Sequence, residues 1–306
     1  LRVDSLGVFV QRSGQKLYQL SYNLDQNDYR SEDLSIGVPD LNDEGIIHIA
    51  VQRQPDTRIH CVRSDGTASI LIFDSGENVI CWVEIETDGT IEDVCVMPGT
   101  SEDAVYYVVN RTGGRYIEKW ALESECRGGT LNKQADSFVA YSGASTATIT
   151  GLSHLNDKTV CAWGGGKDLG TYTVSGGQIT LSEAVTSCIV GLVYTARFKS
   201  AKQAFGAAMG TPLNQRKRID HLGLIMADTH YQGLEYGPDF TTMDSLPLVE
   251  RYEETAADTV WESYDEDMIS FPGEWSTDSR LCLRATAPRP CTVLAATVSM
   301  LTNDKT

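Results

Sequence analysis

Residues 45–90, GIIHIAVQRQPDTRIHCVRSDGTASILIFDSGENVICWVEIETDGT, decide the fold. The stretch contains four short runs of β-branched and aromatic residues, and each run ends at a cluster of Gly, Pro, Asp or Ser. The Asp-Gly and Ser-Gly pairs supply residues that tolerate positive φ in tight turns. This pattern predicts four antiparallel strands, at residues 46–51, 58–63, 68–73 and 79–85. Four such strands over roughly 45 residues match one blade of a β-propeller.

Partial copies of this unit flank it on both sides. Runs at 91–96, 103–110 and 115–121 predict three strands of a following unit. Upstream, residues 7–11 and 15–22 predict a hairpin. The chain is therefore predicted to be all-β, with partial β-propeller-like blades of four antiparallel strands.

The composition changes near residue 127, where the loop sequence Arg127-Gly128-Gly129-Thr130 occurs. Residues 137–200 are rich in Gly, Ser and Thr and carry few charges, which predicts a small inserted β domain. Its short strands are predicted at 147–150, 159–163, 170–174 and 178–181, with glycine turns at 164–166 and 175–177.

The remaining residues predict a return to the blades. Residues 198–210 are the least strand-like stretch and favour a short helix, although Gly206 and Gly210 make it a poor one. Later strands are expected to finish a blade begun before the inserted domain, at 221–227, 280–285 and 291–300. The predicted domains are 1–133 (propeller-like blades), 134–200 (inserted small β domain) and 201–306 (return to a blade, and C-terminal strands).

The charge balance limits the possible partners. The 306 residues carry a formal net charge of −17, with a sequence pI near 4.6. Because a uniformly acidic protein repels phosphate, the charge argues against tight binding of DNA or RNA through a basic surface. No apolar run approaches the roughly 20 residues that span a bilayer, and the opening residues do not match a secretory signal peptide.

The eight cysteines form no CxxC pair, so they lack the spacing of a zinc site. Most lie in apolar runs such as 59–62 and 79–82. We expect reduced thiols that pack as small apolar side chains, which suits assembly in a reducing compartment.

Three patterns that resemble catalytic or metal motifs lack the required context. In residues 164–168, GGGKD, a P-loop would need an earlier Gly, a Ser or Thr after Lys167, and a following helix, so a hairpin turn is predicted. His221 and His230 are nine residues apart, wider than the usual spacing of metal ligands. No GxSxG elbow occurs. The sequence therefore predicts no catalytic, cofactor or metal site.

The densest acidic cluster is the one candidate for chemistry. A glycosidase needs one shielded carboxyl group and a second about 5 to 10 Å away, and Trp261 and Trp275 are placed to line a sugar site or to join the core. A solvated acidic loop or sheet edge is the favoured interpretation. The cluster consists of Asp258, Glu262, Asp265, Glu266 and Asp267.

Several short motifs resemble one known family. FVQRSG at 9–14 with LSY at 20–22, IHCVRSDGT at 59–67 leading to Trp82, and VYYVVNRT at 105–112 with RYIE at 115–118 resemble the tail nozzle proteins of short-tailed bacteriophages, also called tail tubular protein B. TITGLSHL at 148–155 resembles a small β domain, of the kind found in ubiquitin-activating enzymes, that related phage proteins insert at this place.

This resemblance implies a structural, non-enzymatic role without cofactors. Nozzle proteins form a six-fold ring of identical copies below the tail adaptor protein, with tail fibres or spikes nearby, and viral DNA leaves through the lumen without specific binding. The implied location is the virion tail, assembled in the cytoplasm of the bacterial host. An acidic lumen would repel DNA over about 8 Å at physiological ionic strength.

The chain departs from this family in length. Family members are generally much longer and carry further blades upstream, and three partial units do not close a propeller, so an N-terminal part or a separate chain is expected to complete it. Two alternative functions stay open: a polysaccharide-degrading tail protein that uses acids such as Asp258 and Glu262, and a receptor-binding protein that uses the small domain at 137–200.

Overall fold

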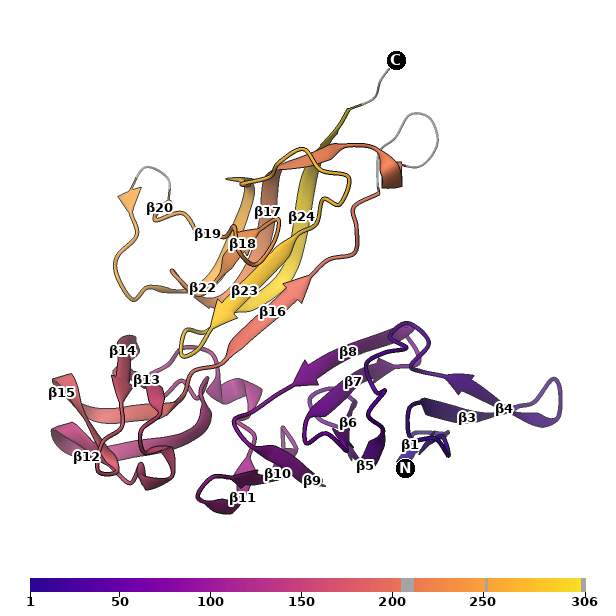
Figure 1. The fold of residues 1–306 in the computed structure, drawn as a ribbon, viewed down its shortest axis with the longest axis horizontal. Helices are drawn as coiled ribbons and strands as arrows, with labels where there is room; N and C mark the ends of the chain where they lie inside the picture. Colours follow the sequence, from indigo (N-terminus) through magenta and orange to yellow (C-terminus); the bar gives the residue numbers. More distant parts are fainter. Residues whose placement is uncertain (205–211, 251–252, 304–306) are drawn as a thin grey trace. The chain divides into compact units, whose positions relative to one another are not determined.

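The computed structural model describes residues 1–204, 212–250 and 253–303, and the chain divides into two compact units, Leu1–Leu122 and Glu123–Thr306. Every sheet is antiparallel, and the only helices among the described residues are three short 3₁₀ turns, η1 (Glu123–Glu125), η2 (Ser153–Leu155) and η3 (Pro212–Asn214) (Figure 1). The all-β prediction is confirmed. No helix of the described part is long and apolar enough to cross a membrane.

The first unit consists of three successive antiparallel sheets. The first blade has the order β1-β2-β3-β4, the second β5-β6-β7-β8, and the third β11-β10-β9. The prediction of four-stranded blades is confirmed for the first two, and the strands predicted within 45–90 appear within one residue of their predicted ends. The bounds are β1 (Arg2–Val3), β2 (Leu6–Val10), β3 (Leu17–Asn23), β4 (Asp28–Asp33), β5 (Ile46–Gln52), β6 (Arg58–Arg63), β7 (Ala68–Asp74), β8 (Val79–Ile85), β9 (Thr90–Met97), β10 (Ala104–Arg111) and β11 (Gly114–Lys119).

The turn between β6 and β7 shows why the local sequence specifies a hairpin. Gly66 has φ +85°, and the Asp65 carboxylate accepts a hydrogen bond from the Thr67 backbone N–H at 3.0 Å. A Cβ atom on Gly66 would lie 2.8 Å from the Thr90 side chain. Glycine is therefore required here both for the left-handed backbone and for the close approach of β9.

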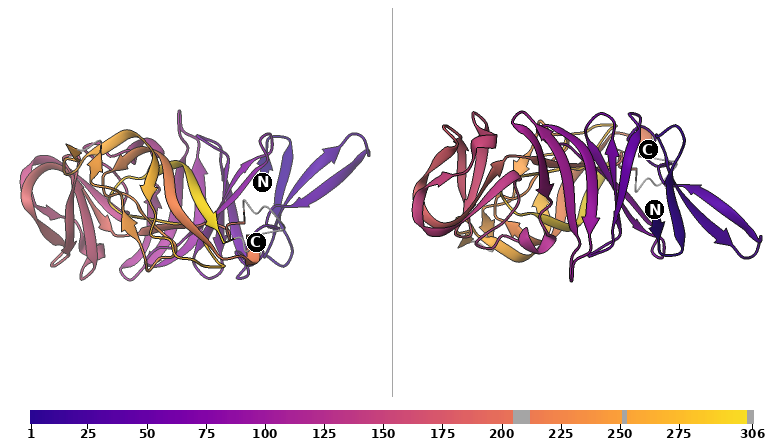
Figure 2. Two further views of the ribbon diagram at one scale, coloured as in Figure 1. Left: turned by 90° about the horizontal axis from the view of Figure 1, so that it is seen from above. Right: turned by 90° about the horizontal axis from the view of Figure 1, so that it is seen from below.

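Successive blades of the first unit pack face to face through apolar side chains. The strands of these blades lie side by side in both views of Figure 2. The period-2 alternation of β6 sends Ile59 and Cys61 toward the first blade and Val62 toward the third. One core joins the first and second blades (Val3, Val8, Leu17, Leu34, Ile46, Ile59, Cys61, Leu71 and Phe73). Another joins the second and third (Ala50, Val62, Ala68, Ile91, Val94, Val105, Tyr107 and Val109).

The first sheet of the second unit has the order β12-β15-β13-β14 and its own buried core around Leu152, Val160 and Val190. Both glycine turns are confirmed: Gly165 and Gly166 have positive φ between β13 and β14, as do Gly176 and Gly177 before β15. Strands β12 and β15 are much longer than predicted, because they continue through Ser- and Thr-rich sequence. The bounds are β12 (Asp136–Thr150), β13 (Thr159–Gly164), β14 (Lys167–Thr173) and β15 (Gln178–Leu192).

The C-terminal strands form two sheets of their own, ordered β16-β23-β18-β19 and β22-β17-β24, which share one buried core that includes Leu224, Tyr236 and Leu283. The prediction that these strands finish a blade begun before the inserted domain is therefore wrong. A further pair, β20-β21, completes the second unit. The bounds are β16 (Thr195–Lys199), β17 (Lys217–His230), β18 (Glu235–Gly237), β19 (Asp244–Ser245), β20 (Val249–Glu250), β21 (Glu253–Glu254), β22 (Val260–Ser270), β23 (Cys282–Thr286) and β24 (Thr292–Thr302).

Two further predictions have mixed outcomes. The helix predicted at 198–210 is wrong where the chain is described, because 198–199 belong to β16 and 200–204 are irregular; residues 205–210 lie outside the described part. The domain boundaries at 133 and 200 stay predictions.

All eight cysteines are free thiols, as expected, but they differ in burial. Cys61, Cys161, Cys188 and Cys282 are buried, whereas Cys81 and Cys95 are exposed. Burial raises the pKa of Cys61 to about 12, which keeps that thiol protonated and unreactive.

The shared core predicts a strong effect of truncating Leu71. We expect Leu71→Ala to lower the free energy of unfolding by about 2–5 kcal/mol, because a fully buried side chain leaves a cavity between two blades. Ile36→Ala is the matched control, since Ile36 is 77% exposed, and its effect should stay within about 0.5 kcal/mol. Urea unfolding measures both variants, and equal effects would contradict the assignment of Leu71 to the core.

Candidate functional site

Four members of the acidic cluster, Glu262, Asp265, Glu266 and Asp267, lie on the edge strand β22, and Asp258 precedes it. Glu262 and Asp265 are exposed and Glu266 is half-buried. Asp265 pairs in register with Ile225 and Glu266 with Leu224, so neighbouring carboxylates point to opposite faces of the sheet. The side chain of Asp267 lies outside the described residues.

The two tryptophans near this strand differ in role. Trp261 is half-buried, packs on Tyr264 with ring centroids 4.7 Å apart, and lies against the core of the C-terminal sheets. Trp275 is 40% exposed. Trp261 is thus a core residue, and it does not line a sugar site with the exposed acids.

The glycine-rich stretch at 164–168 is a hairpin, as predicted. Gly164 pairs with Lys167 across the turn, and the Lys167 ammonium forms an ion pair with Glu183 Oε1 of β15 at 2.7 Å. Lys167 is therefore engaged on a sheet surface and does not point into a loop that binds phosphate.

Asp258 lies apart from the rest of the cluster, beside His230. Its Oδ1 is 3.8 Å from His230 Nε2, a buried nitrogen without a hydrogen-bond partner among the described residues. The other ring nitrogen, Nδ1, accepts a hydrogen bond from the Gln232 backbone N–H at 3.2 Å. Trp163 contacts the imidazole edge-on, with centroids 5.8 Å apart. His230 is 1% exposed, and burial lowers its pKa, with Arg289 adding to the effect.

A partly buried polar junction continues from His230 to the β13–β14 hairpin. Arg289 Nε donates to Asp168 Oδ2 at 2.9 Å, and its Nη1 donates to the Gln232 carbonyl at 3.3 Å. Asn132, which is fully buried, donates to the Pro288 carbonyl at 2.6 Å. The β13–β14 hairpin is thereby fastened to the loops that follow β17 and β23. Sequence analysis singled out His230 but missed Asp168 and Arg289 as its neighbours.

The groups at this junction are arranged to hold chain segments together and not to catalyse a reaction. The His230 imidazole and an Arg–carboxylate pair hold three chain segments, and among the described residues no hydroxyl or thiol nucleophile is hydrogen-bonded to His230. His221 lies elsewhere on β17 and pairs with Asp220 at 3.1 Å. In the part of the chain that the structure describes, no three His, Cys, Asp or Glu side chains are grouped to hold a metal ion.

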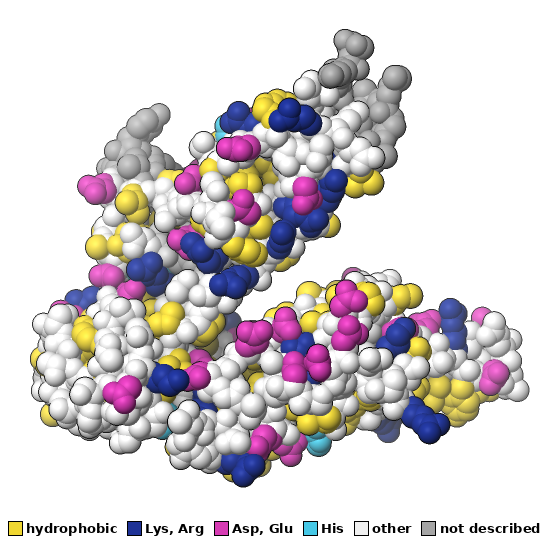
Figure 3. Space-filling model, in the orientation of Figure 1, with side chains coloured by type: hydrophobic (Ala, Val, Ile, Leu, Met, Phe, Trp, Pro, Cys, Tyr) yellow, Lys and Arg dark blue, Asp and Glu magenta, His cyan; other side chains and the backbone are white. Residues whose placement is uncertain are grey.

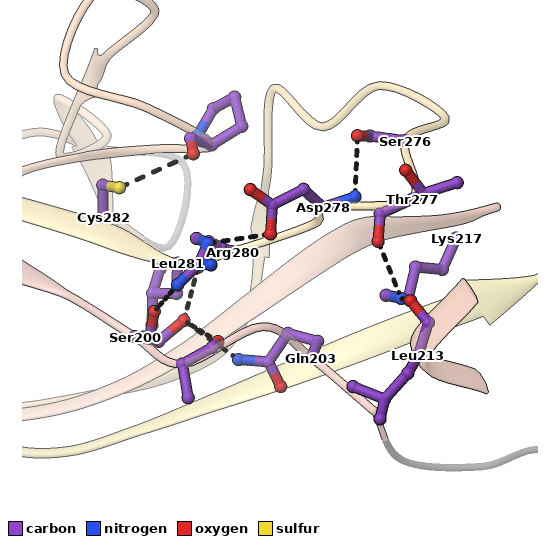
Figure 4. A network of polar contacts seen from close by, with 12 residues as sticks. Ser200, Gln203, Leu213, Lys217, Ser276, Thr277, Asp278, Arg280, Leu281 and Cys282 are labelled. Carbon is purple, nitrogen blue, oxygen red and sulfur yellow. Dashed lines mark hydrogen bonds and ion pairs between the residues drawn. The ribbon is translucent and has the colours of Figure 1, made fainter. Parts of the chain in front are cut away.

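A second polar network surrounds Lys217, at the start of β17 (Figure 4). Its side chain is fully buried, and its ammonium donates to the carbonyl oxygens of Thr277 at 3.1 Å and Leu213 at 3.3 Å. Burial lowers the pKa of Lys217. Because the ammonium is enclosed and donates to carbonyls, Lys217 joins two loops to the sheet and does not present a nucleophile.

In the first unit, His60 occupies the interface between the second and third blades. Its Nδ1 is 2.7 Å from the Tyr107 hydroxyl, and its Nε2 is 3.1 Å from Gln52 Oε1. Trp120 contacts both rings. Burial, aided by Arg58, lowers the pKa of His60 to about 4. The alternation of β6 places this polar side chain on a core face, where hydrogen bonds satisfy it.

Comparisons with known proteins add little to this geometry. No family model and no curated protein matches the chain. Among solved structures, a sialidase from Trypanosoma rangeli in complex with sialic acid matches with 11% identity and a TM-score of 0.20, over 98% of this chain and 81% of that one. A TM-score this low supports no conclusion about fold or activity.

The buried His60 predicts a pH-dependent stability. Its folded pKa of about 4 lies below the ordinary value of 6.5, so the unfolded chain binds more protons and stability falls as the pH drops from about 6.5 to 4, by roughly 3 kcal/mol at most. We expect His60→Leu to flatten the dependence of the unfolding free energy on pH. His48→Leu, at an exposed histidine, should leave the slope unchanged. If the unfolding free energy of the His60→Leu variant kept the same dependence on pH, the lowered pKa assigned to buried His60 would be contradicted.

The junction predicts a measurable coupling between Asp168 and Arg289. A double-mutant cycle with Asp168→Asn and Arg289→Gln should give a coupling of about 0.5–3 kcal/mol, because the Asp168 side chain is only 13% exposed. The neighbouring pair Lys167–Glu183 is a matched control with both side chains more than 40% exposed. Its coupling should stay below about 0.5 kcal/mol. Thermal or urea unfolding measures both coupling energies. Equal values for the two pairs would contradict the conclusion that the Asp168–Arg289 pair holds the junction together.

Proposed function

We propose that this chain is a structural component of a phage tail that assembles with copies of itself into a nozzle ring, through whose lumen DNA leaves. The single observation that carries the proposal is the series of antiparallel blades sharing face-to-face cores. The motifs that resemble nozzle proteins fall within these blades, at the ends of β2, β6 and β10.

The distribution of charge supports the passage of DNA without binding. The first unit contains 20 Asp and Glu against 10 Lys and Arg, a net charge of −10. Several of its bases are already neutralised: Arg111 forms a two-armed pair with Glu118, and Arg115 with Glu92. Figure 3 shows acidic side chains exposed on the strands of this unit. Such a surface repels DNA phosphates within about 8 Å at physiological salt.

The titratable groups of the chain fit a structural role. His60, Lys217, His230 and Asp168 are hydrogen-bonded or enclosed at junctions between sheets, and the exposed acids of β22 do not converge. No observation favours glycan hydrolysis or receptor binding over assembly. The proposed activity therefore belongs to the assembled ring and not to one side-chain constellation.

Imaging of phage particles tests the proposal. Gold-labelled antibodies raised against this chain should mark the end of the tail on intact particles, and quantitative mass spectrometry should find six copies per particle. Label on the capsid, or on no particle at all, would reject the nozzle assignment. Antibodies preabsorbed with the purified chain provide the control.

A further inference from the structure

The junction at His230 joins two parts of the second unit through a small apolar contact and several polar ones. The apolar cluster at this place contains Ala287 from the loop after β23, and Ala135, Cys161 and Ile189 from β13, β15 and the start of β12. Because so few apolar side chains meet there, their burial contributes little free energy. A change in the polar contacts therefore decides how firmly the β13–β14 hairpin is held.

The hydrogen bonds of His230 define its tautomer. Nδ1 accepts from the Gln232 backbone N–H at 3.2 Å, so this nitrogen carries no proton and the ring proton is on Nε2. Among the described residues Nε2 has no hydrogen-bond partner, although the side chain is only 1% exposed. A buried donor without an acceptor costs free energy. The closed junction thus contains one donor that a rearrangement would satisfy.

Charged groups face the ring from three other segments. Burial and, after it, Arg289 lower the pKa of His230 from its ordinary value of 6.5, while Asp168 on β14 and Asp258 before β22 oppose this shift. Asp258 Oδ1 lies 3.8 Å from Nε2. The other charged or titratable groups close to this site are the ion pairs Arg127–Asp228 and Lys167–Glu183 and the phenol of Tyr231, whose ring contacts the imidazole.

We propose that His230 is a proton-controlled latch, whose protonation releases the β13–β14 hairpin from the loops that follow β17 and β23. A proton from water binds Nδ1, the ring nitrogen with an available lone pair, so Nδ1 becomes a donor and no longer accepts from the Gln232 N–H. The turn that carries Gln232 then moves, together with the carbonyl that accepts from Arg289 Nη1 at 3.3 Å. The imidazolium also repels Arg289, and both changes weaken the hold of Arg289 on Asp168.

Asp258 supplies the charged ring with a partner. Its side chain is 37% exposed, and its backbone has φ +61°, an uncommon conformation for a residue other than glycine. The imidazolium attracts this carboxylate across the remaining gap, which permits a charge-assisted hydrogen bond from Nε2. The ring therefore has two arrangements, a neutral one bonded to Gln232 and a charged one bonded to Asp258. This latch goes beyond the proposed function and does not rest on it, because it lies within the second unit alone.

Hydrogen exchange of the full chain tests the latch. Exchange times are corrected for the intrinsic effect of pH, and peptides from the β13–β14 hairpin are compared with peptides from 222–226 of β17, in the core of the C-terminal sheets. Protection of the hairpin amides should fall by about tenfold for each pH unit below about 6.5, because the released ring has its ordinary pKa and the latched ring a lower one. The β17 peptides should keep their protection.

Matched variants separate the latch from general unfolding in acid. His230→Asn keeps an acceptor near the position of Nδ1 and does not titrate, so its hairpin should stay protected down to about pH 5. His221→Gln, on the same strand, should behave like the unchanged chain. Asp258→Asn should lower the pH of release by about one unit, whereas Asp265→Asn on β22 should not change it. His60→Leu, in the first unit, should also leave the release unchanged.

Nuclear magnetic resonance of the imidazole nitrogens checks the protonation state of His230 directly. The latch predicts the tautomer with a proton on Nε2 at neutral pH. A proton on Nδ1 instead, titration of His230 without a change in hairpin protection, or the same loss of protection in folded His230→Asn would each overturn the inference. If His230→Asn does not fold, the two aspartate variants decide, and equal shifts in Asp258→Asn and Asp265→Asn would reject the latch.

Discussion

The fold of the first unit depends on one physical constraint: the apolar face of each antiparallel sheet must be covered by the next sheet. Strands such as β6 are apolar on both sides, with Ile59 and Cys61 on one face and Val62 on the other. A sheet of that kind is stable only between two others, because leaving either face in water forfeits the hydrophobic free energy of burial. The same constraint explains why the polar side chain of His60, on an inward position, is fully hydrogen-bonded.

How far the sequence predicted this fold depends on the range of the interactions involved. The strands between 45 and 90 were predicted closely because alternation and the Asp65-Gly66 turn are local signals. Strand β22 was not predicted, because its acids interrupt the apolar alternation and its pairing with β17 is what orders it. The long extensions of β12 and β15 were missed for a similar reason, since their Ser- and Thr-rich residues gain strand structure from each other.

The candidate site was predictable only in part. The acidic cluster was identified from residues that are close together in the sequence, and Glu262 and Asp265 are exposed on β22. The junction at His230 was not predictable, because Asp168 and Arg289 are 121 residues apart and nothing in either local sequence points to the other. Similarly, the C-terminal strands carry ordinary strand patterns, and only the pairing of β17 with β22 and β24 shows that they form their own sheets.

The charge of the chain and the packing of its blades are consistent with one kind of function. Basic side chains such as Arg111 are buried in ion pairs with acids at the ends of strands. The chain has more acidic than basic residues, and the surplus acids remain at the surface. Exposed apolar side chains occur in both units, for example Ile36 in the first and Leu294 in the second. A surplus of surface acids over blades that pack face to face suits the proposed structural role.

The most direct test of this account is an experimental structure of the purified chain. The account predicts that Ile59 and Cys61 are buried against the first blade and Val62 against the third. A structure in which either face of the second blade is open to solvent would contradict it.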